Sequence, residues 1–518
     1  MRTHVNAATA LFLTALMLTS LLVIQQPTPA EVLPEEDLTF DEPLLTSGRS
    51  STATYLTAGS SANNEFGSHI EALPTGGWVI GSEFNSTLSY GTQTLAPTSP
   101  YRQNNGIGEF FLGVMDDKGA WVNLFGADHN YGSGGLSFIS DITIGMAGDI
   151  FVSGYFYGEI AFGPPTPDTV ISNTNSGFFD EGFIARADPM GNWMWAKSFT
   201  TLVNGSGEFS RTTALQVDMM DDLFVTGMFQ GETDFGGMSL NATSQDVYVA
   251  KFDGNQGTLS WVVYGGGIGV DSVFDMAITP SNGVKIATGT TGISQWGSNT
   301  YIAVGSLDAV IVEIDPNAAI TGLTGMGTPN QQTLVLQIFV DGSGDTYLSG
   351  TFGGTLSSGG WTATATYGGN DIFVAKSAVN QANSWAAVAG TSSTDQPQGM
   401  AVTSNGGVAF GGLITSTFYA GSKSLSNQNY DGFAVGLSPN GAVDWIERIG
   451  GTGYDIVFSV ASNNSDYIGL AGAFTGSMTH KGTQVTSGGN YDVFSWIFDP
   501  SSLKDTDGDG VLDSAPDN

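Results

Sequence analysis

The stretch that decides the fold is DIFVAKS, residues 371–377. An acidic residue opens it, and apolar residues then recur with a period of two, as in a β-strand with one buried face. The same pattern occurs seven times, at intervals of 60 to 72 residues. The other copies are EFFLGVM at Glu109, EGFIARA at Glu181, DVYVAKF at Asp246, DAVIVEI at Asp308, DGFAVGL at Asp431 and DVFSWIF at Asp492. A pattern repeated at this spacing predicts a chain built from one supersecondary unit.

Each copy is flanked by further strand patterns. Upstream lies a strand that ends in glycines and aromatic residues, such as IFVSGYFYGEIAFG from Ile150, and before it a short apolar strand, such as DMAITPSNG. Downstream, most copies are followed by a strand with a tryptophan, which we expect to pack between neighbouring units. These tryptophans are Trp121, Trp193, Trp261, Trp385 and Trp445. Four short strands per unit, repeated seven times, are typical of a seven-bladed β-propeller.

The two ends of the repeat region complete each other. The unit at Asp492 runs into DPSSLKDTDGDG and has no fourth strand, whereas TATYLTAGSSANNE before the first unit resembles that missing strand. We therefore expect residues 52–58 to pair with the strand at Asp492, which removes an open sheet edge. The predicted fold class is all-β, a seven-bladed β-propeller of four-stranded antiparallel blades over residues 51–500, with an N-terminal strand that closes the last blade.

Several segments resemble a known family. DIFVAKS, IERIGGTGYD and GMAVTSNGG are similar to the repeat of the seven-bladed β-propeller family of exported bacterial and archaeal proteins. The resemblance covers roughly residues 51–500 and rests on the sevenfold recurrence of short motifs. It implies a propeller fold and an exported location, and it implies no particular reaction.

The first 50 residues predict export. Arg2 supplies a positive charge, residues 7–24 are apolar, and Thr28 and Ala30 suit a cleavage site. We interpret residues 1–30 as a signal peptide. Because the apolar run is longer than the usual roughly 7–15 residues, an uncleaved signal anchor is the alternative. Residues 31–50 form an acidic, flexible spacer, and the protein is expected to be secreted or displayed at the cell surface.

Composition restricts the partners. The chain has 14 Lys and Arg against 49 Asp and Glu, a net charge of −35. Such a chain repels nucleic acid and anionic lipid, so contact with a membrane is expected only through an uncleaved N-terminal anchor. There is no cysteine among the 518 residues, which excludes disulfides, thiolate metal sites and thiol nucleophiles.

The C-terminal stretch KDTDGDGVLDSAPDN predicts a calcium site within the tail, residues 501–518. Alternating aspartates in a tight loop supply the oxygen ligands that Ca²⁺ requires. The predicted ligands are Asp505, Asp507, Asp509 and Asp513. The motif is similar to a thrombospondin type 3 repeat, or to the first half of an EF-hand loop. It departs from both, because Pro516 stands at loop position twelve and no cysteine follows. A solvated acidic tail is the alternative.

Two further sets of acidic residues recur. The seven that open the strands repeat in every unit, which indicates a structural role in which the carboxylate accepts backbone N–H groups. The second set precedes the innermost strands. Its members are Glu65, Glu208, Asp271, Asp395 and Asp455, with Leu136 and Gln332 at the same place in the other two units. These acids would suit a cation or amine site around the channel, but we expect them to cap the loop against the next blade.

No catalytic motif stands out. H-E-x-x-H, G-x-S-x-G and phosphate-loop patterns are absent from the sequence. Our first hypothesis is an exported, non-enzymatic binding or adhesion propeller whose partner is an extracellular protein or a glycan. The alternative is a secreted carboxylate-based polysaccharide hydrolase with its site at the channel mouth, because two acids suffice for that chemistry. A structural component of a cell envelope is the third. Two neighbouring acids that break the repeat would favour the hydrolase, and an aromatic face would favour binding.

Overall fold

The computed structural model describes residues 55–59, 65–99, 108–132, 134–164, 166, 169–173, 180–202, 207–426, 430–480, 483–489 and 491–503. All of them belong to the second of the chain's two units, residues 48–518. The predicted signal segment, the acidic spacer and the four aspartates of the calcium motif lie outside the described residues. Within the described ranges, no helix is long and apolar enough to cross a membrane.

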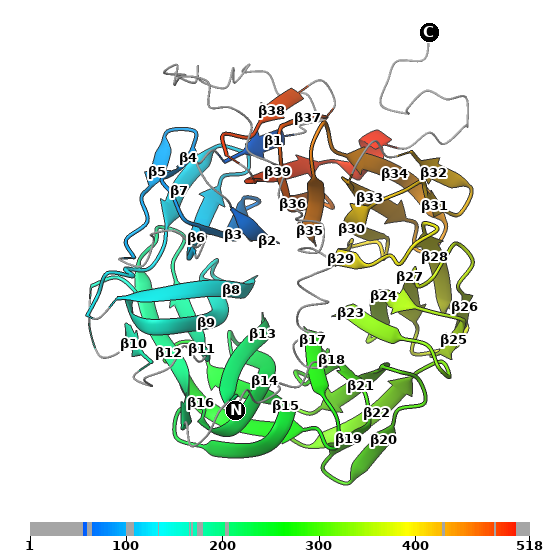
Figure 1. Ribbon diagram of the computed structural model, residues 1–518, viewed down its shortest axis with the longest axis horizontal. Helices are drawn as coiled ribbons and strands as arrows, with labels where there is room; N and C mark the ends of the chain where they lie inside the picture. Colours follow the sequence, from blue (N-terminus) through cyan, green and yellow to red (C-terminus); the bar gives the residue numbers. More distant parts are fainter. Residues whose placement is uncertain are drawn as a thin grey trace, which may run out of the picture. The chain divides into compact units, whose positions relative to one another are not determined.

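Seven four-stranded antiparallel units follow one another along the chain (Figure 1). In each unit the first strand pairs with the second, the second with the third, and the third with the fourth. Blade 1 contains β2 (Phe66–Ala72), β3 (Trp78–Phe84), β6 (Glu109–Met115) and β7 (Trp121–Phe125). Blade 2 contains β8 (Gly135–Ile144), β9 (Ile150–Ala161), β11 (Glu181–Ala187) and β12 (Trp193–Leu202). Blade 3 contains β13 (Phe209–Val217), β14 (Leu223–Asp234), β15 (Ser239–Asp253) and β16 (Thr258–Gly265).

The remaining blades follow the same order. Blade 4 contains β17 (Asp271–Ile278), β18 (Val284–Thr290), β21 (Asp308–Ile314) and β22 (Ile320–Met326). Blade 5 contains β23 (Thr333–Val340), β24 (Thr346–Phe352), β27 (Asp371–Ser377) and β28 (Trp385–Gly390). Blade 6 contains β29 (Pro397–Val402), β30 (Val408–Ile414), β33 (Asp431–Leu437) and β34 (Val443–Ile449). Blade 7 contains β35 (Asp455–Ser462), β36 (Ile468–Phe474), β39 (Asp492–Phe498) and β1 (Tyr55–Ala58).

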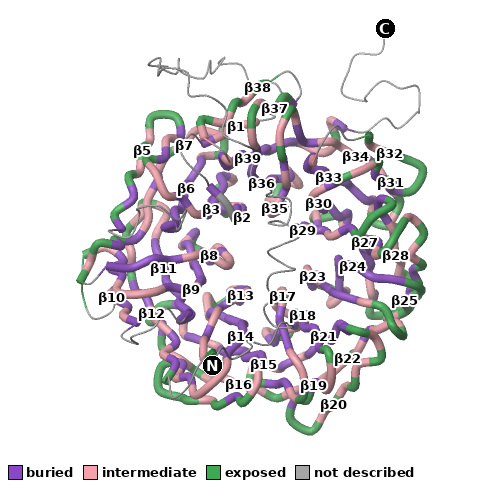
Figure 2. Tube along the Cα trace, viewed as in Figure 1, coloured by how far each residue is buried: buried purple, intermediate pink, exposed green. Residues whose placement is uncertain are grey.

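Short strands extend the connection between the second and third strand of six blades. They are β4 (Leu88–Tyr90), β5 (Gln93–Leu95), β10 (Val170–Ser172), β19 (Ile293–Trp296), β20 (Asn299–Ile302), β25 (Thr355–Ser358), β26 (Trp361–Thr364), β31 (Phe418–Ala420), β32 (Lys423–Leu425), β37 (Ser477–His480) and β38 (Thr483–Thr486). A 3-10 turn, η1 (Pro500–Leu503), follows β39. Many of these outer hairpins are exposed, whereas the four-stranded cores of the blades are mostly buried (Figure 2).

Blade 7 is assembled from both ends of the described chain. β1 pairs antiparallel with β39, with Leu56 opposite Trp496 and Ala58 opposite Phe494. This pairing confirms the all-β, seven-bladed architecture and the closing N-terminal strand, which was expected within residues 52–58. The third strand of blade 7 therefore has a partner on each side, and its polar backbone groups are satisfied.

The innermost strands of successive blades touch all the way round, and β35 of blade 7 contacts β2 of blade 1. Ser68 Oγ donates a hydrogen bond to the carbonyl of Gly472 (3.2 Å) at this last junction. In the described residues, seven clusters of buried apolar side chains lie one at each junction between consecutive blades. Each blade is thus stabilised chiefly by its two neighbours, so the hydrophobic core is distributed around a closed ring.

Polar side chains at one β-bulge position connect the innermost strands. Asp141 Oδ2 accepts the backbone N–H of Leu215 in the next blade (3.0 Å). Asp275 Oδ2 accepts the N–H of Ile338 in the same way (2.8 Å). At Gly399, which holds this position in blade 6, an added Cβ would stand 2.6 Å from the nitrogen of Val460. At this level of the ring, a carboxylate hydrogen bond joins blades 2 and 4 to their next blades, and close backbone packing at Gly399 joins blade 6 to blade 7.

Tryptophans fix the outer part of the junctions. Trp195, Trp261 and Trp385 donate their indole N–H to carbonyls in the turn between the third and fourth strand of the next blade. The acceptors are Gly254 (3.0 Å), Pro316 (3.0 Å) and Pro439 (2.9 Å). The expected packing of tryptophan between blades is confirmed at Trp261 and Trp385. In blade 2, Trp195 makes this bond, whereas Trp193 bonds back to Gly126 of blade 1 (3.1 Å).

Candidate functional site

The antiparallel order gives the ring two different faces. The first and third strand of every blade begin on one face, which we call the start face, and their opposite ends carry the turns of the other, the turn face. Both recurring sets of acids precede or open first and third strands, so both belong to the start face.

The strand-opening acids are structural. Glu109 Oε2 accepts the N–H of Thr98 (2.9 Å), and Asp371 Oδ2 accepts the N–H of Tyr367 (2.8 Å). All seven of these carboxyl groups are buried. Each bond joins the start of the third strand to the loop just before it, so the carboxylate fixes the path of that loop. The predicted structural role is confirmed at these positions.

A glycine lies against the opening aspartate in blades 3 to 6. The four glycines, each directly after the fourth strand or at its end, are Gly266, Gly327, Gly390 and Gly450. An added Cβ on any of them would stand 3.0 Å or less from the carboxylate. Blades 1 and 2 instead open with glutamate, and the strand register places Asp128 and Thr200 opposite. This pairing of glycine with aspartate was not predicted, although the glycine after the fourth strand is its signal in the sequence.

The predicted set of residues before the innermost strands is wrong in three blades. Strand pairing places Ser137, Ser210 and Thr333 at the position that Asp271 holds in blade 4. The predicted Leu136, Glu208 and Gln332 stand one or two residues earlier, so their assignment was wrong. In blade 3 a β-bulge lies between Thr212 and Ala214, so Ala214 corresponds to Asp275 of blade 4. Glu65, Asp271, Asp395 and Asp455 are at the expected position.

These loop acids meet the strand-opening acid of the preceding blade. Both Asp431 Oδ1 and Asp455 Oδ2 lie within 3.0 Å of the point where a Cβ on Gly450 would stand. Asp455 also accepts the N–H of Gly451 (2.8 Å), which closes its own loop as expected for a cap. Burial, and then the charge of Asp431, raise the pKa of Asp455 to about 7. In the described ranges, no three or more His, Cys, Asp or Glu side chains are arranged to hold a metal ion.

Another group of carboxyls lies on the innermost strands of blades 1, 2 and 4. Burial raises the pKa of Glu71 to about 8, and the charge of Asp275 adds to this shift. Burial also raises the pKa of Asp275 to about 7 and that of Asp141 well above its usual range. Asp141 and Asp275 each accept a backbone N–H of the next blade, as described above, so both have a structural task. Glu71 has no such bond to another blade among the described contacts.

The most distinctive break in the repeat is aromatic. Tyr430 and Tyr491 stand directly before the opening aspartates of blades 6 and 7, where the other blades have Gly108, Asp180, Gln245, Leu307 and Asn370. Tyr454, which precedes Asp455, stacks on Tyr430 with ring centroids 4.7 Å apart and an interplanar angle of 20°. In blades 5 and 6, Tyr367 and Tyr419 stack with ring centroids 5.6 Å apart and an interplanar angle of 8°. Tyr419 is 43% exposed and Tyr454 is 37% exposed.

These five residues define the tyrosine surface of the start face: Tyr367, Tyr419, Tyr430, Tyr454 and Tyr491. Tyr419 is part of β31, and Tyr430 forms a parallel bridge with Tyr454. Tyrosine offers a large contact area with two rotatable angles and a polar end, so it loses little conformational entropy on binding.

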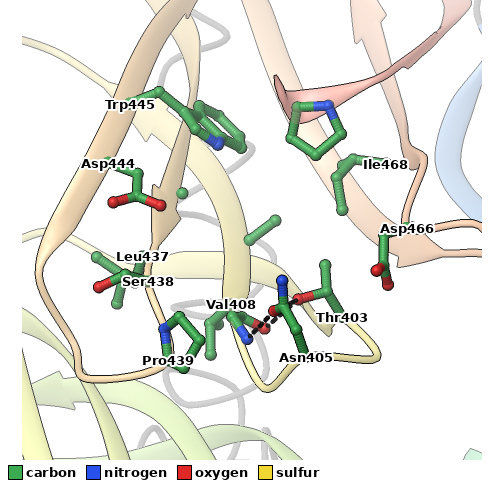
Figure 3. A pocket seen from close by; sticks show the side chains of 14 residues that line it. Thr403, Asn405, Val408, Leu437, Ser438, Pro439, Asp444, Trp445, Asp466 and Ile468 are labelled. Carbon is green, nitrogen blue, oxygen red and sulfur yellow. Dashed lines mark hydrogen bonds between the residues drawn. The ribbon is translucent and has the colours of Figure 1, made fainter. Parts of the chain in front are cut away.

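A small cavity lies on the turn face between blades 6 and 7 (Figure 3). Its volume is about 70 Å³, and Trp445, Asp444, Asp466 and Pro500 are among its lining residues. In blades 2, 3 and 5, the turn of the next blade accepts the indole N–H of the corresponding tryptophan, whereas η1 follows the third strand of blade 7 at this junction. Asp466 already accepts the N–H of Ser404 (2.6 Å). Ligand pockets usually measure roughly 300–1,000 Å³, so this cavity suits a few water molecules rather than an organic ligand.

No protein-family model and no curated protein sequence matches the chain. Among solved structures, a protein of unknown function from Dyadobacter fermentans is 9% identical, with a TM-score of 0.38, and the match covers 86% of this chain and 99% of that one. The Dos1 propeller is 8% identical, with a TM-score of 0.40, covering 85% and 95%. A polysaccharide lyase of family PL25, an ulvan lyase, is 10% identical, with a TM-score of 0.42, covering 79% and 92%. At TM-scores below 0.5, these likenesses carry no functional argument.

Proposed function

We propose that this protein is an exported, non-enzymatic binding or adhesion propeller, and that its tyrosine surface binds a neutral glycan outside the cell. The observation that carries the proposal is the group of stacked, partly exposed tyrosines where blades 5, 6 and 7 depart from the repeat. Aromatic rings present apolar faces to the C–H groups of sugars, while their hydroxyl groups exchange hydrogen bonds. A net charge of −35 disfavours anionic glycans.

Binding to neutral polysaccharides tests this function. The full chain would be incubated with insoluble cellulose, chitin, mannan and β-glucan, and the bound fraction measured. We expect Tyr430→Ala/Tyr454→Ala to lose at least tenfold in affinity for the polysaccharide that the natural sequence binds. Phe339→Ala is the matched control, because Phe339 is a 39% exposed aromatic residue at the end of β23 on the turn face. Equal binding by the tyrosine variant would overturn the proposal, and capture of a protein partner instead would replace the glycan.

The polysaccharide hydrolase is the second candidate, and Glu71 is the residue that favours it. Its counterparts on the other innermost strands are not acidic, and burial raises its pKa towards the range of a general acid. The charge of Asp275 adds to this shift, and the charge of Glu71 in turn helps to raise the pKa of Asp141. Release of reducing ends from any of the same polysaccharides, abolished in Glu71→Gln, would favour hydrolysis over simple binding.

Calcium binding by the C-terminal tail completes the proposal. Asp505, Asp507, Asp509 and Asp513 would supply carboxylate oxygens to one Ca²⁺, although this segment lies outside the described residues. Calorimetric titration of the full chain with Ca²⁺ tests it. Loss of heat in Asp507→Ala/Asp509→Ala would support a site in the tail, and unchanged heat would remove it. Export is a separate test: cell fractionation after expression of the chain with residues 1–30 would show whether the protein leaves the cytoplasm.

A further inference from the structure

Four methionines stand in turns of the turn face in blades 2 and 3. They are Met146 between β8 and β9, Met190 between β11 and β12, and Met219 and Met220 between β13 and β14. In this order the residues are 66%, 77%, 74% and 73% exposed. Large apolar side chains that gather in the solvent on one face mark interaction surfaces. We call these four residues the methionine surface.

The methionines break the repeat. The turn between the first and second strand is closed by the same two backbone hydrogen bonds in every blade, and this alignment gives Met146 and Met219 the same position. The other five blades have Pro74, Pro280, Gly342, Ser404 and Asn464 there. The counterparts of Met190 in blades 1, 4 and 6 are Lys118, Asn317 and Asn440. Because these other residues form the same turns, turn formation does not account for the methionines.

The three turns that carry the methionine surface are in contact. The N–H of Met146 donates a hydrogen bond to Asp221 Oδ1 (2.7 Å), which links the first turn of blade 2 to the first turn of blade 3. Within blade 2, a Cβ added to Gly148 would stand 3.9 Å from Pro189 Cγ, so the first turn also touches the turn of Met190. One partner can therefore contact all three turns together.

The same three turns are acidic. They contain Asp149, Asp188, Asp218, Asp221 and Asp222. Two cations bond to this group: Arg186 Nε lies 3.1 Å from Asp149 Oδ2, and Lys251 Nζ lies 2.9 Å from Asp222 Oδ2 and 3.3 Å from Asp218 Oδ2. Asp188 and Asp221 instead accept backbone N–H groups. Five carboxylates against two cations leave the turns around the methionine surface with a negative charge, which attracts a basic partner.

We propose that the methionine surface docks a segment of another protein whose apolar face is bordered by lysine or arginine. Methionine is unbranched and polarizable, so it adapts its shape to an apolar partner. The aspartates of the same turns then face the basic residues of that partner. A second copy of this chain is disfavoured as the occupant, because it would bring the same acids and a net charge of −35. This surface lies on the turn face, away from the tyrosine surface of the start face, so the two can be occupied independently.

Binding of a defined probe tests the proposal. The probe is a synthetic amphipathic helix of leucine and lysine, labelled for fluorescence anisotropy and titrated with the full chain at low and at high salt. The test variant is Met146→Gln/Met190→Gln/Met219→Gln/Met220→Gln. The matched control removes four other exposed apolar side chains: Ile268→Gln/Ile302→Gln/Val304→Gln/Val379→Gln. We expect about a tenfold loss of affinity in the test variant at both salt concentrations and no loss in the control. Unchanged binding by the test variant, or no binding of the probe to the natural sequence, would overturn the proposal.

Oxidation of the natural sequence keeps the test decisive if the test variant does not fold. Mild hydrogen peroxide converts exposed methionines to sulfoxides, which are polar, and methionine sulfoxide reductases reverse the change. We expect the oxidised protein to lose the probe to the same extent and the reductases to restore binding. Unchanged binding after oxidation, with the sulfoxides verified by mass spectrometry, would overturn the proposal.

Two further measurements identify the occupant. A probe with serine in place of lysine should bind more weakly at low salt, because the aspartates then have no cation to attract. Equal binding of the two probes would overturn the assignment of a basic partner. Sedimentation of the natural sequence without a probe should show a monomer. A dimer that is lost in the methionine variant would make a second copy the occupant and would overturn the proposal.

Discussion

The junction between blades 6 and 7 differs from the junction between blades 1 and 2 in the group that faces the buried strand-opening carboxylate. Between blades 6 and 7, a short opening acid, Asp431, lies against Gly450 and faces a second acid, Asp455. Between blades 1 and 2, the longer Glu109 faces a histidine: His129 Nδ1 is 3.2 Å from Glu109 Oε2, and His129 Nε2 is 2.6 Å from Ser137 Oγ. A repeat can therefore keep its backbone geometry while the group that faces the buried carboxylate changes.

Loss of the histidine should have the largest effect. We expect His129→Ala to lower the free energy of unfolding by about 3 kcal/mol, because the buried Glu109 and Ser137 both lose a partner and a cavity remains. Urea unfolding measures it. His129→Gln, which keeps a hydrogen-bonding side chain, should lose less. A cost below about 1 kcal/mol for His129→Ala would show that Glu109 is held by the N–H groups of its own loop.

Substitution of Gly450, at the junction between blades 6 and 7, should have the next largest effect on stability. We expect Gly450→Ala to cost about 2 kcal/mol, because its Cβ would press on both Asp431 and Asp455. The comparison substitution is Asp128→Ala, at the corresponding place in blade 1, where the residue is exposed. We expect a cost of less than about 1 kcal/mol there. Equal costs would mean that the glycine serves the backbone turn rather than the carboxyl pair.

The stability of the two junctions should change with pH in opposite directions, because burial raises the pKa of Asp455 whereas the contacts of Glu109 lower its pKa. Burial alone would raise the pKa of Glu109, but the contacts with His129 and the N–H bonds from Thr98 and Ser99 lower it overall. Its stabilising contribution is therefore present above the unfolded pKa of about 4.5 and is lost as the pH falls through the lower folded value. Glu109→Gln should destabilise the protein at pH 7 and cost much less at pH 3. An equal cost at both values would contradict this sign.

The smallest effect on stability is expected at the tyrosine that borders the acid pair. Tyr454 is 37% exposed, so Tyr454→Ala should cost less than about 1 kcal/mol. The same variant should bind neutral polysaccharide more weakly, whereas Tyr467→Ala, in a turn-face position of blade 7, should not. A large loss of stability in Tyr454→Ala would show that this ring belongs to the junction rather than to a binding surface.

Much of the fold followed from local patterns. Alternating apolar residues after each opening acid predicted the third strand of all seven blades, from Glu109 to Asp492, because a strand with a buried face requires that period. The pairing of residues 52–58 with the strand at Asp492 was predicted because the last unit lacked a strand that the beginning of the chain supplied. Tryptophan between blades followed from its recurrence. These features depend on neighbours in the sequence, or on the requirement that the repeat closes.

The site could be predicted only in part. Counting residues placed Leu136, Glu208 and Gln332 beside the true loop acids, because the sequence does not reveal where a β-bulge or a longer loop shifts the strand register. The pairing of acids across junctions, the glycine beneath them and the stacking of Tyr430 on Tyr454 join residues about 20 positions or more apart. Tertiary structure decides such contacts, since burial and the approach of two blades determine which carboxyl groups meet. The sequence by itself determined a ring of seven four-stranded units. Only the tertiary structure determined which of its many acids are buried together at a junction and which side chains stay exposed, because these depend on how two blades approach each other.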